Sequence, residues 1–152
     1  MGIDRKCDGN CPLCEVVNKA VEMGVLVVAA AGNDGPAIGT INCPANARKA
    51  IAVGAVDKSD NVWNKSSRGK KNQKKPDLVA PGVVDVSGFT MSGTSLSAPL
   101  VTGALALLLS KYKDKEKVLT SLLESCEDLD YEFYEQGHGK LRVDKALRWS
   151  KR

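Results

Sequence analysis

Apolar residues recur along this chain in patterns that predict helices and buried strands. Between Pro12 and Met23 they recur at helical spacing, and Gly24 stands where a helix cap is expected, so a helix over residues 12–23 is predicted. Three other segments are continuous apolar runs without polar alternation, a pattern typical of strands buried on both faces. These runs cover residues 25–30, 50–56 and 77–80.

The second half of the chain is predicted to be mainly helical. Residues 98–112 are apolar on nearly every face, which predicts a central, wholly buried helix. Asp114 is a predicted helix cap, and the apolar residues at 118–123 that follow it predict a peripheral helix. Residues 143–149 predict an amphipathic piece on the outside. Strands that alternate with helices predict a layered α/β fold with a mostly parallel sheet, and no repeat or linker divides it.

Composition narrows the class of protein. The chain has 152 residues, 43% hydrophobic and 26% charged, as expected for one globular domain or part of one. The net charge of +4 derives largely from the basic run between Lys65 and Lys75, which we interpret as a solvated loop. No aromatic residues accompany this run as a stacking platform, so nucleic-acid binding is not expected.

Hydropathy gives no indication of a membrane protein. The apolar stretch 98–109 is shorter than the roughly 20 residues that a membrane span needs, so a core helix is expected instead. The first residues lack the apolar core of a signal peptide and leave the compartment open.

Ser95 and Asn33 are the candidate catalytic residues. Ser95 follows a glycine at the start of the predicted central helix, where unpaired backbone N–H groups can hold an oxyanion. Asn33 follows the first predicted strand, and loops at the carboxyl ends of parallel strands converge. Each residue alone suits an ordinary structural role, as a cap or in a turn. Together they suit acyl transfer, with Ser95 as the nucleophile and Asn33 as an oxyanion donor.

The segments around both residues resemble a known family. Residues 29–35 (AAAGNDG) and 92–99 (SGTSLSAP) are similar to the oxyanion-asparagine and nucleophile motifs of the subtilisin-like serine proteases. The resemblance extends over nearly the whole chain, with further matches at residues 51–57, 66–69, 75–82 and 137–147. It implies a partial three-layer subtilisin-like fold and a serine endopeptidase that cleaves polypeptides through an acyl-enzyme.

The resemblance also implies roles for individual residues. Ser95 would be the nucleophile and Asn33 the oxyanion donor, while Ala30, Ala31 and Gly32 would line the substrate pocket, with Thr94 as a supporting neighbour. Bound calcium occurs in the family, but the resemblance assigns no residue to it. We expect no other cofactor, and no residue is assigned as a metal ligand.

Two catalytic motifs of the family are absent from this sequence. The family's catalytic aspartate and histidine motifs, Asp-Thr/Ser-Gly and His-Gly-Thr, lie upstream of the region that is matched and do not occur here. The single histidine, His138, lies in a closing glycine turn and is expected to be structural or exposed. Two smaller departures are Leu100, where many members have histidine, and a short path between residues 82 and 91.

We therefore expect residues 1–152 to be the C-terminal portion of one peptidase domain, inactive alone. Its expected partners are a polypeptide substrate and the absent N-terminal segment, without which a sheet edge and a core face would be exposed. The alternative is a non-catalytic remnant that binds peptides or a partner chain. Family members are often secreted, but the compartment is not determined.

The cysteines allow several states. Cys7, Cys11 and Cys14 lie close together in sequence, Cys43 follows the Asn33 loop, and Cys126 lies far away. Reduced thiols, one or two disulfides and a four-thiolate zinc site all remain open for the first four. The Cys11-x2-Cys14 spacing also occurs in redox motifs, but the sequence predicts no strand before it such as a thioredoxin-like unit needs.

Overall fold

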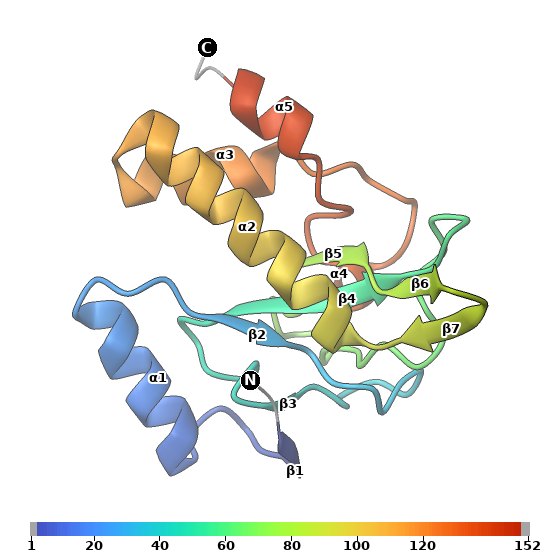
Figure 1. Cartoon of the computed structure of the whole chain (residues 1–152). Helices are drawn as coiled ribbons and strands as arrows, with labels where there is room; N and C mark the ends of the chain where they lie inside the picture. Colours follow the sequence, from blue (N-terminus) through green and yellow to red (C-terminus); the bar gives the residue numbers. More distant parts are fainter. Residues whose placement is uncertain (1–2, 150–152) are drawn as a thin grey trace.

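The computed structural model describes residues 3–149, which form a mixed α/β fold (Figure 1). The strands are β1 (Ile3–Lys6), β2 (Val28–Ala30), β3 (Asn42–Cys43), β4 (Ile51–Val56), β5 (Leu78–Pro81), β6 (Val83–Val86) and β7 (Phe89–Ser92). The helices are α1 (Pro12–Glu22), α2 (Thr94–Tyr112), α3 (Lys115–Glu124), α4 (Phe133–Gln136) and α5 (Val143–Arg148).

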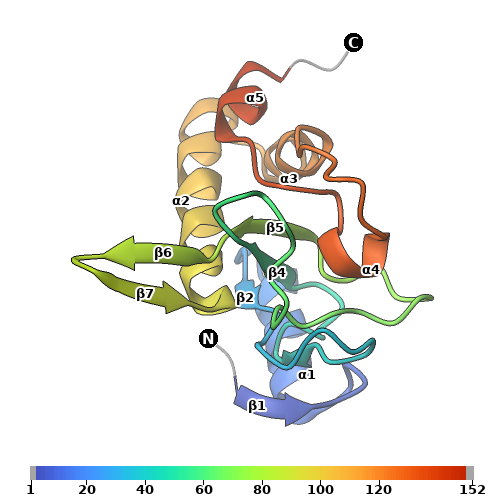
Figure 2. The same cartoon turned by 90° about the vertical axis from the view of Figure 1, so that its right-hand side faces the viewer.

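The central sheet is parallel, as the sequence predicts. Its strand order is β2-β4-β5, with Ala30 opposite Val53 and Val53 opposite Leu78. Helices α2, α3 and α5 lie on one side of this sheet, and α1 lies on the other side with β1 and β3 (Figure 1). Two antiparallel pairs, β1-β3 and β6-β7, stand apart from the central sheet, and the β6-β7 hairpin projects from the body (Figure 2).

Alternate residues of each strand face different apolar clusters. Ala30 and Val53 pack in the cluster that contains the buried face of α2. Ala29 and Ala52 point to the other face of the sheet, where they pack with Ile41. Both faces are covered, so the strands contain apolar residues at consecutive positions.

Helix α2 is central but has an exposed face, which corrects the prediction of a wholly buried helix. Val101, Leu105 and Leu108 are buried against the sheet, whereas Leu100 and Leu107 are 46% and 53% exposed. The helix is long and apolar enough to span a membrane by length and composition. Its contacts with β2, β4, β5 and α3 identify it as a core helix with one apolar side uncovered.

The first strand is shorter than its apolar run predicts. Residues 25–27 lie outside β2, whose pairing with β4 begins at Val28 and Ile51, although the Val27 carbonyl accepts a hydrogen bond from the Ile51 N–H at 2.8 Å. The backbone N–H of Val25 instead donates to the carbonyl of Ala20, which completes the end of α1. The cap at Asp114 is confirmed, since its side chain accepts a hydrogen bond from the Glu116 backbone N–H at 3.0 Å.

The basic run between residues 65 and 75 is not a uniformly solvated loop. Arg68 is buried and forms an ion pair with Glu135, with Nε and Oε1 3.1 Å apart. Lys75 is also buried, and its Nζ lies 2.6 Å from Asp77 Oδ2. The sequence did not reveal the partner of Arg68, because Glu135 comes from α4, which is distant along the chain.

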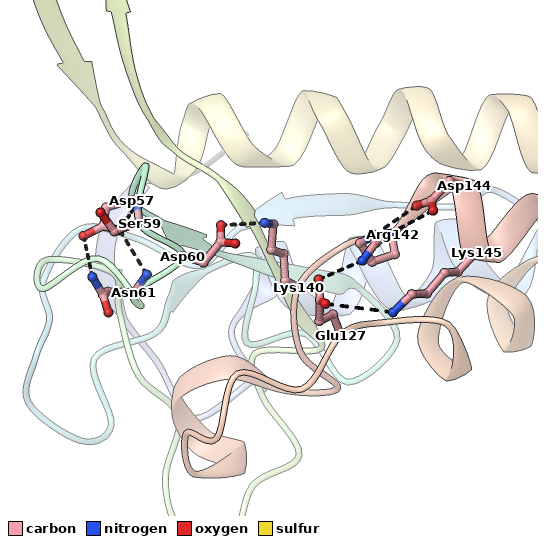
Figure 3. A network of polar contacts seen from close by, with 9 residues as sticks. All are labelled: Asp57, Ser59, Asp60, Asn61, Glu127, Lys140, Arg142, Asp144 and Lys145. Carbon is pink, nitrogen blue, oxygen red and sulfur yellow. Dashed lines mark hydrogen bonds and ion pairs between the residues drawn. The ribbon is translucent and has the colours of Figure 1, made fainter.

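A network of polar side chains lies along the C-terminal segment beside β5 (Figure 3). Lys140 Nζ lies 2.5 Å from Asp60 Oδ1, while Arg142 bonds both Glu127 and Asp144. The hydrogen bonds from Arg142 hold the pKa of Asp144 at about 2. Backbone hydrogen bonds of residues 139–141 with Val79 continue the sheet pattern beyond β5, so the segment is held mainly by its backbone.

The two faces of α2 provide a matched test of this packing. Leu108→Ala is expected to lower the free energy of unfolding by about 2–5 kcal/mol, because Leu108 is fully buried. Leu107→Ala removes the same atoms from the exposed face and is expected to cost under about 1 kcal/mol. Urea denaturation of the two variants measures the difference, and equal losses would contradict the assigned orientation of α2.

Candidate active site

A hydrogen-bonded bridge joins the loop after β2 to the first residue of α2. The backbone N–H of Thr94 donates to Asn33 Oδ1 at 3.0 Å, and the Thr94 hydroxyl lies 3.2 Å from the same oxygen. The Gly32 backbone N–H donates in turn to Thr94 Oγ1 at 3.1 Å. Because Oδ1 accepts from a backbone N–H, the amide orientation of Asn33 is defined, and Nδ2 is left as the donor for another group.

Two glycines allow the close approach of these segments. Gly32 has a φ of 112°, and a Cβ there would lie 2.7 Å from Asn42 Nδ2. Gly93, which precedes α2, has a φ of 154°. Side chains rarely occupy either conformation, so glycine at these positions is what allows the bridge to form.

Ser95 lies in the first turn of α2 and is exposed. Its backbone N–H is among the first-turn donors, which have no carbonyl one turn earlier in the helix. The helix dipole adds a partial positive charge at the same end. Asn33 Nδ2 and the Ser95 backbone nitrogen both lie beside Gly93, where an added Cβ would be 3.5 Å from the first and 3.9 Å from the second. Two donors on one small space are what stabilising an oxyanion requires.

A shallow hollow of about 300 Å³ lies beside Ser95, between β2 and α2. Its walls include Val28, Ala30, Ala98 and Thr102. Of the residues expected to bind substrate, Ala30 is therefore at this hollow, whereas the Ala31 side chain is buried in the cluster on the other face of the sheet.

Gly32 and Thr94 lie at the bridge to Asn33, and Thr94 is only 1% exposed. Their positions indicate that they hold Asn33 in place. The assignment of all four residues to substrate binding stays a prediction.

His138 lies at the wrong end of β5 to act on Ser95. Its backbone N–H donates to the carbonyl of Asp77, immediately before β5, and its ring packs edge-on against Phe133. The Ser95 end of α2 is joined to the other end of the strand, through the bond from Gly93 N–H to the Gly82 carbonyl. At about 3.3 Å per residue these ends are roughly 16 Å apart, so His138 is placed away from the serine.

Sequence reasoning did not single out Ser97, which fixes α2 to the sheet. Ser97 is fully buried, and its Oγ lies 3.0 Å from the Ala80 carbonyl oxygen and 3.2 Å from that of Pro81. The signal in the sequence was its position two residues after Ser95. In a helix this spacing places Ser97 on the side opposite the exposed Ser95. It holds the start of α2 over the carboxyl end of β5.

Four thiols form a second cluster on the α1 side of the sheet. The Sγ atoms of Cys7, Cys11, Cys14 and Cys43 all lie within 4.8 Å of one another. A hydrogen bond from the Cys14 backbone N–H is the main cause that lowers the pKa of Cys11 to about 6. Burial raises the pKa of Cys14 to about 12. Cys126 lies outside the cluster, and burial raises its pKa to about 12.

Comparison with known proteins identifies the relatives of this chain. The model of the subtilase family matches residues 2–130. The chain is 37% identical to the mouse membrane-bound transcription factor site-1 protease over 157 aligned residues, which cover 90% of this chain and 15% of that protein. It is 38% identical to subtilisin DY of Bacillus licheniformis, covering 92% of this chain and 53% of that protein.

Solved structures show the same fold. The prenylagaramide maturation protease PagA aligns with a TM-score of 0.76 and 31% identity, over 97% of this chain and 58% of that one. The protease domain of PatA, as its S218A mutant, aligns with a TM-score of 0.78 and 29% identity, over 97% of this chain and 56% of that one. The chain thus spans only part of each of these relatives.

The bridge between Thr94 and the Asn33 loop can be tested through stability. Thr94→Val is expected to cost about 1–3 kcal/mol, because it leaves the Gly32 N–H without its acceptor in a buried place. Thr102→Val makes the same change on the exposed side of α2, where the hydroxyl bonds only the Ala98 carbonyl, and is expected to cost under about 0.5 kcal/mol. Chemical denaturation compares the two, and a neutral Thr94→Val would show that the Thr94 hydroxyl contributes nothing to the bridge.

Proposed function

The chain belongs to the subtilase family, and we propose that it supplies the nucleophile and oxyanion site of a serine endopeptidase. The observation that carries this proposal is the bridge that orients Asn33 beside the N-terminus of α2, where Ser95 lies. In the proposed reaction, Ser95 Oγ attacks the carbonyl carbon of a peptide bond. Asn33 Nδ2–H and the Ser95 backbone N–H stabilise the resulting oxyanion, and water then releases the acyl group from Ser95.

This chemistry needs a base that the described residues do not place near Ser95. Serine at its ordinary pKa is a weak nucleophile, and loss of the base in a serine triad costs on the order of 10⁶ in turnover. We propose that the histidine and its orienting aspartate come from a polypeptide segment outside residues 1–152. The chain by itself is then expected to be nearly inert.

The surface around Ser95 supports a role for such a segment. Strand β2 is at the edge of the described sheet, and the hollow beside Ser95 lies between this strand and α2. The exposed apolar face of α2, with Leu100 and Leu107, adds a surface that is costly to leave in water. A segment that bonds to the edge of β2 and covers α2 would bury this face and bring its base to Ser95.

Labelling with a fluorophosphonate probe tests whether the nucleophile and its base come from two different polypeptide segments. The chain alone is expected to react no faster than its Ser95→Ala variant, because no base activates the hydroxyl. Coexpression with the polypeptide encoded immediately upstream of Met1 is expected to give labelling at Ser95 and peptide hydrolysis. Rapid labelling of Ser95 in the chain alone would contradict the need for an external base. A well-folded complex without either activity would favour the alternative, a peptide- or partner-binding module.

Asn33 can be tested in the same active complex. Asn33→Ala is expected to lower kcat by about 10²–10³-fold with a smaller change in KM, because the amide acts mainly on the developing oxyanion. Asn72→Ala changes another exposed asparagine that lies in the basic loop and is expected to leave kcat unchanged. An unchanged kcat for Asn33→Ala would remove Asn33 from the oxyanion site.

A further inference from the structure

The four-cysteine cluster, Cys7, Cys11, Cys14 and Cys43, takes no part in the serine chemistry. Its members come from separate parts of the chain: Cys7 follows β1, Cys11 and Cys14 belong to the start of α1, and Cys43 lies in β3. We propose that these four thiolates bind one Zn²⁺ ion as a structural site.

The distances between the sulfur atoms fit a single tetrahedral ion. The Sγ atoms of Cys11 and Cys43 lie 3.2 Å apart, those of Cys7 and Cys14 3.5 Å, and those of Cys14 and Cys43 3.8 Å. Four sulfurs at about 2.3 Å from a tetrahedral zinc ion are about 3.8 Å from one another. The contact between Cys14 and Cys43 brings the Cys11–Cys43 pair and the Cys7–Cys14 pair into one group of four sulfurs. One shared ion requires such a group, whereas two separate disulfides do not.

The spacing and surroundings of the cysteines also suit zinc. Two residues separate Cys11 from Cys14 and three separate Cys7 from Cys11, both within the range of structural zinc sites. The backbone N–H of Gly9 lies 3.4 Å from Cys7 Sγ, and the N-terminus of α1 adds partial positive charge beside Cys11 and Cys14. These donors stabilise thiolates, and bound thiols release their protons to solvent as zinc binds.

Burial indicates that the site is structural. Cys14 and Cys43 are fully buried, and the cluster packs with Val17 and Ala47 from α1 and the loop after β3. Four protein ligands complete the coordination of zinc and leave no position for substrate or activated water. The ion would therefore crosslink the segment around residues 7–14 to β3.

This crosslink adjoins the loop that carries Asn33. Cys43 follows Asn42, whose backbone N–H donates to the Ala31 carbonyl at 2.9 Å. The Asn42 side-chain amide donates to Asp34 Oδ2 at 2.9 Å. A zinc ion that fixes β3 would thus support the loop on both sides of Asn33, and the zinc site itself does not depend on the proposed peptidase activity.

Metal analysis of the 152-residue chain, purified without chelator or reductant, tests the proposal. Mass spectrometry of the metals is expected to find one zinc per chain. Replacement by Co²⁺ is expected to give the visible absorption of tetrahedral cobalt and the strong near-ultraviolet bands of thiolate ligands. Cys11→Ser and Cys43→Ser are expected to lose the bound zinc, whereas Cys126→Ser, which changes the one cysteine outside the cluster, is expected to retain it.

Several results would overturn the assignment. One would be four free thiols with no metal, and another would be a mass lowered by the four hydrogens lost on forming two disulfides. Iron at one ion per chain would also contradict zinc. Cys7→His guards against variants that fail to fold, because histidine is also a zinc ligand. It is expected to keep one ion with weaker thiolate absorption, and a soluble Cys7→His chain with unchanged cobalt spectra would remove Cys7 from the site.

Discussion

The arrangement of the active-site region depends on the hydrogen bonds that Asn33 Oδ1 accepts from Thr94. They connect the loop after β2 to the N-terminus of α2, two segments that lie sixty-one positions apart in the sequence. Because they use the oxygen end of the amide, they orient its nitrogen end as a donor. The Thr94 N–H is also one of the first-turn backbone donors of α2, so the same hydrogen bond satisfies the helix end and orients the Asn33 amide.

The parallel sheet explains why this interaction forms where it does. Strands β2, β4 and β5 place their carboxyl ends at one edge, and α2 begins there because Ser97 binds the carbonyl groups at the end of β5. Packing of Val101 and Leu108 on the sheet then holds the rest of the helix. The loop with Asn33 and the turn with Ser95 are therefore brought together by the core, and the proposed chemistry would use groups that the fold has already positioned.

The sequence predicted the buried parts of this fold better than its surface. The run that forms β4 is apolar throughout and buried on both faces, so its pattern is unambiguous. The β6-β7 hairpin was missed, because β7 is exposed along its length and carries no burial pattern. The sequence signal for this hairpin was the Ser87-Gly88 pair. In the structure both residues have the positive φ angles of a tight turn. The sequence left the state of Cys7, Cys11, Cys14 and Cys43 open, because only the tertiary fold shows that β3 lies at the start of α1 and that all four sulfur atoms meet.

The most direct test of the oxyanion site is a crystal structure of the active complex with a peptide boronate bound to Ser95. A boronate adduct mimics the tetrahedral intermediate, with one oxygen in the place of the oxyanion. We predict that this oxygen lies about 2.7–3.1 Å from both Asn33 Nδ2 and the Ser95 backbone nitrogen. An adduct on Ser95 whose oxygens point away from Asn33, or an adduct on another residue, would contradict the account.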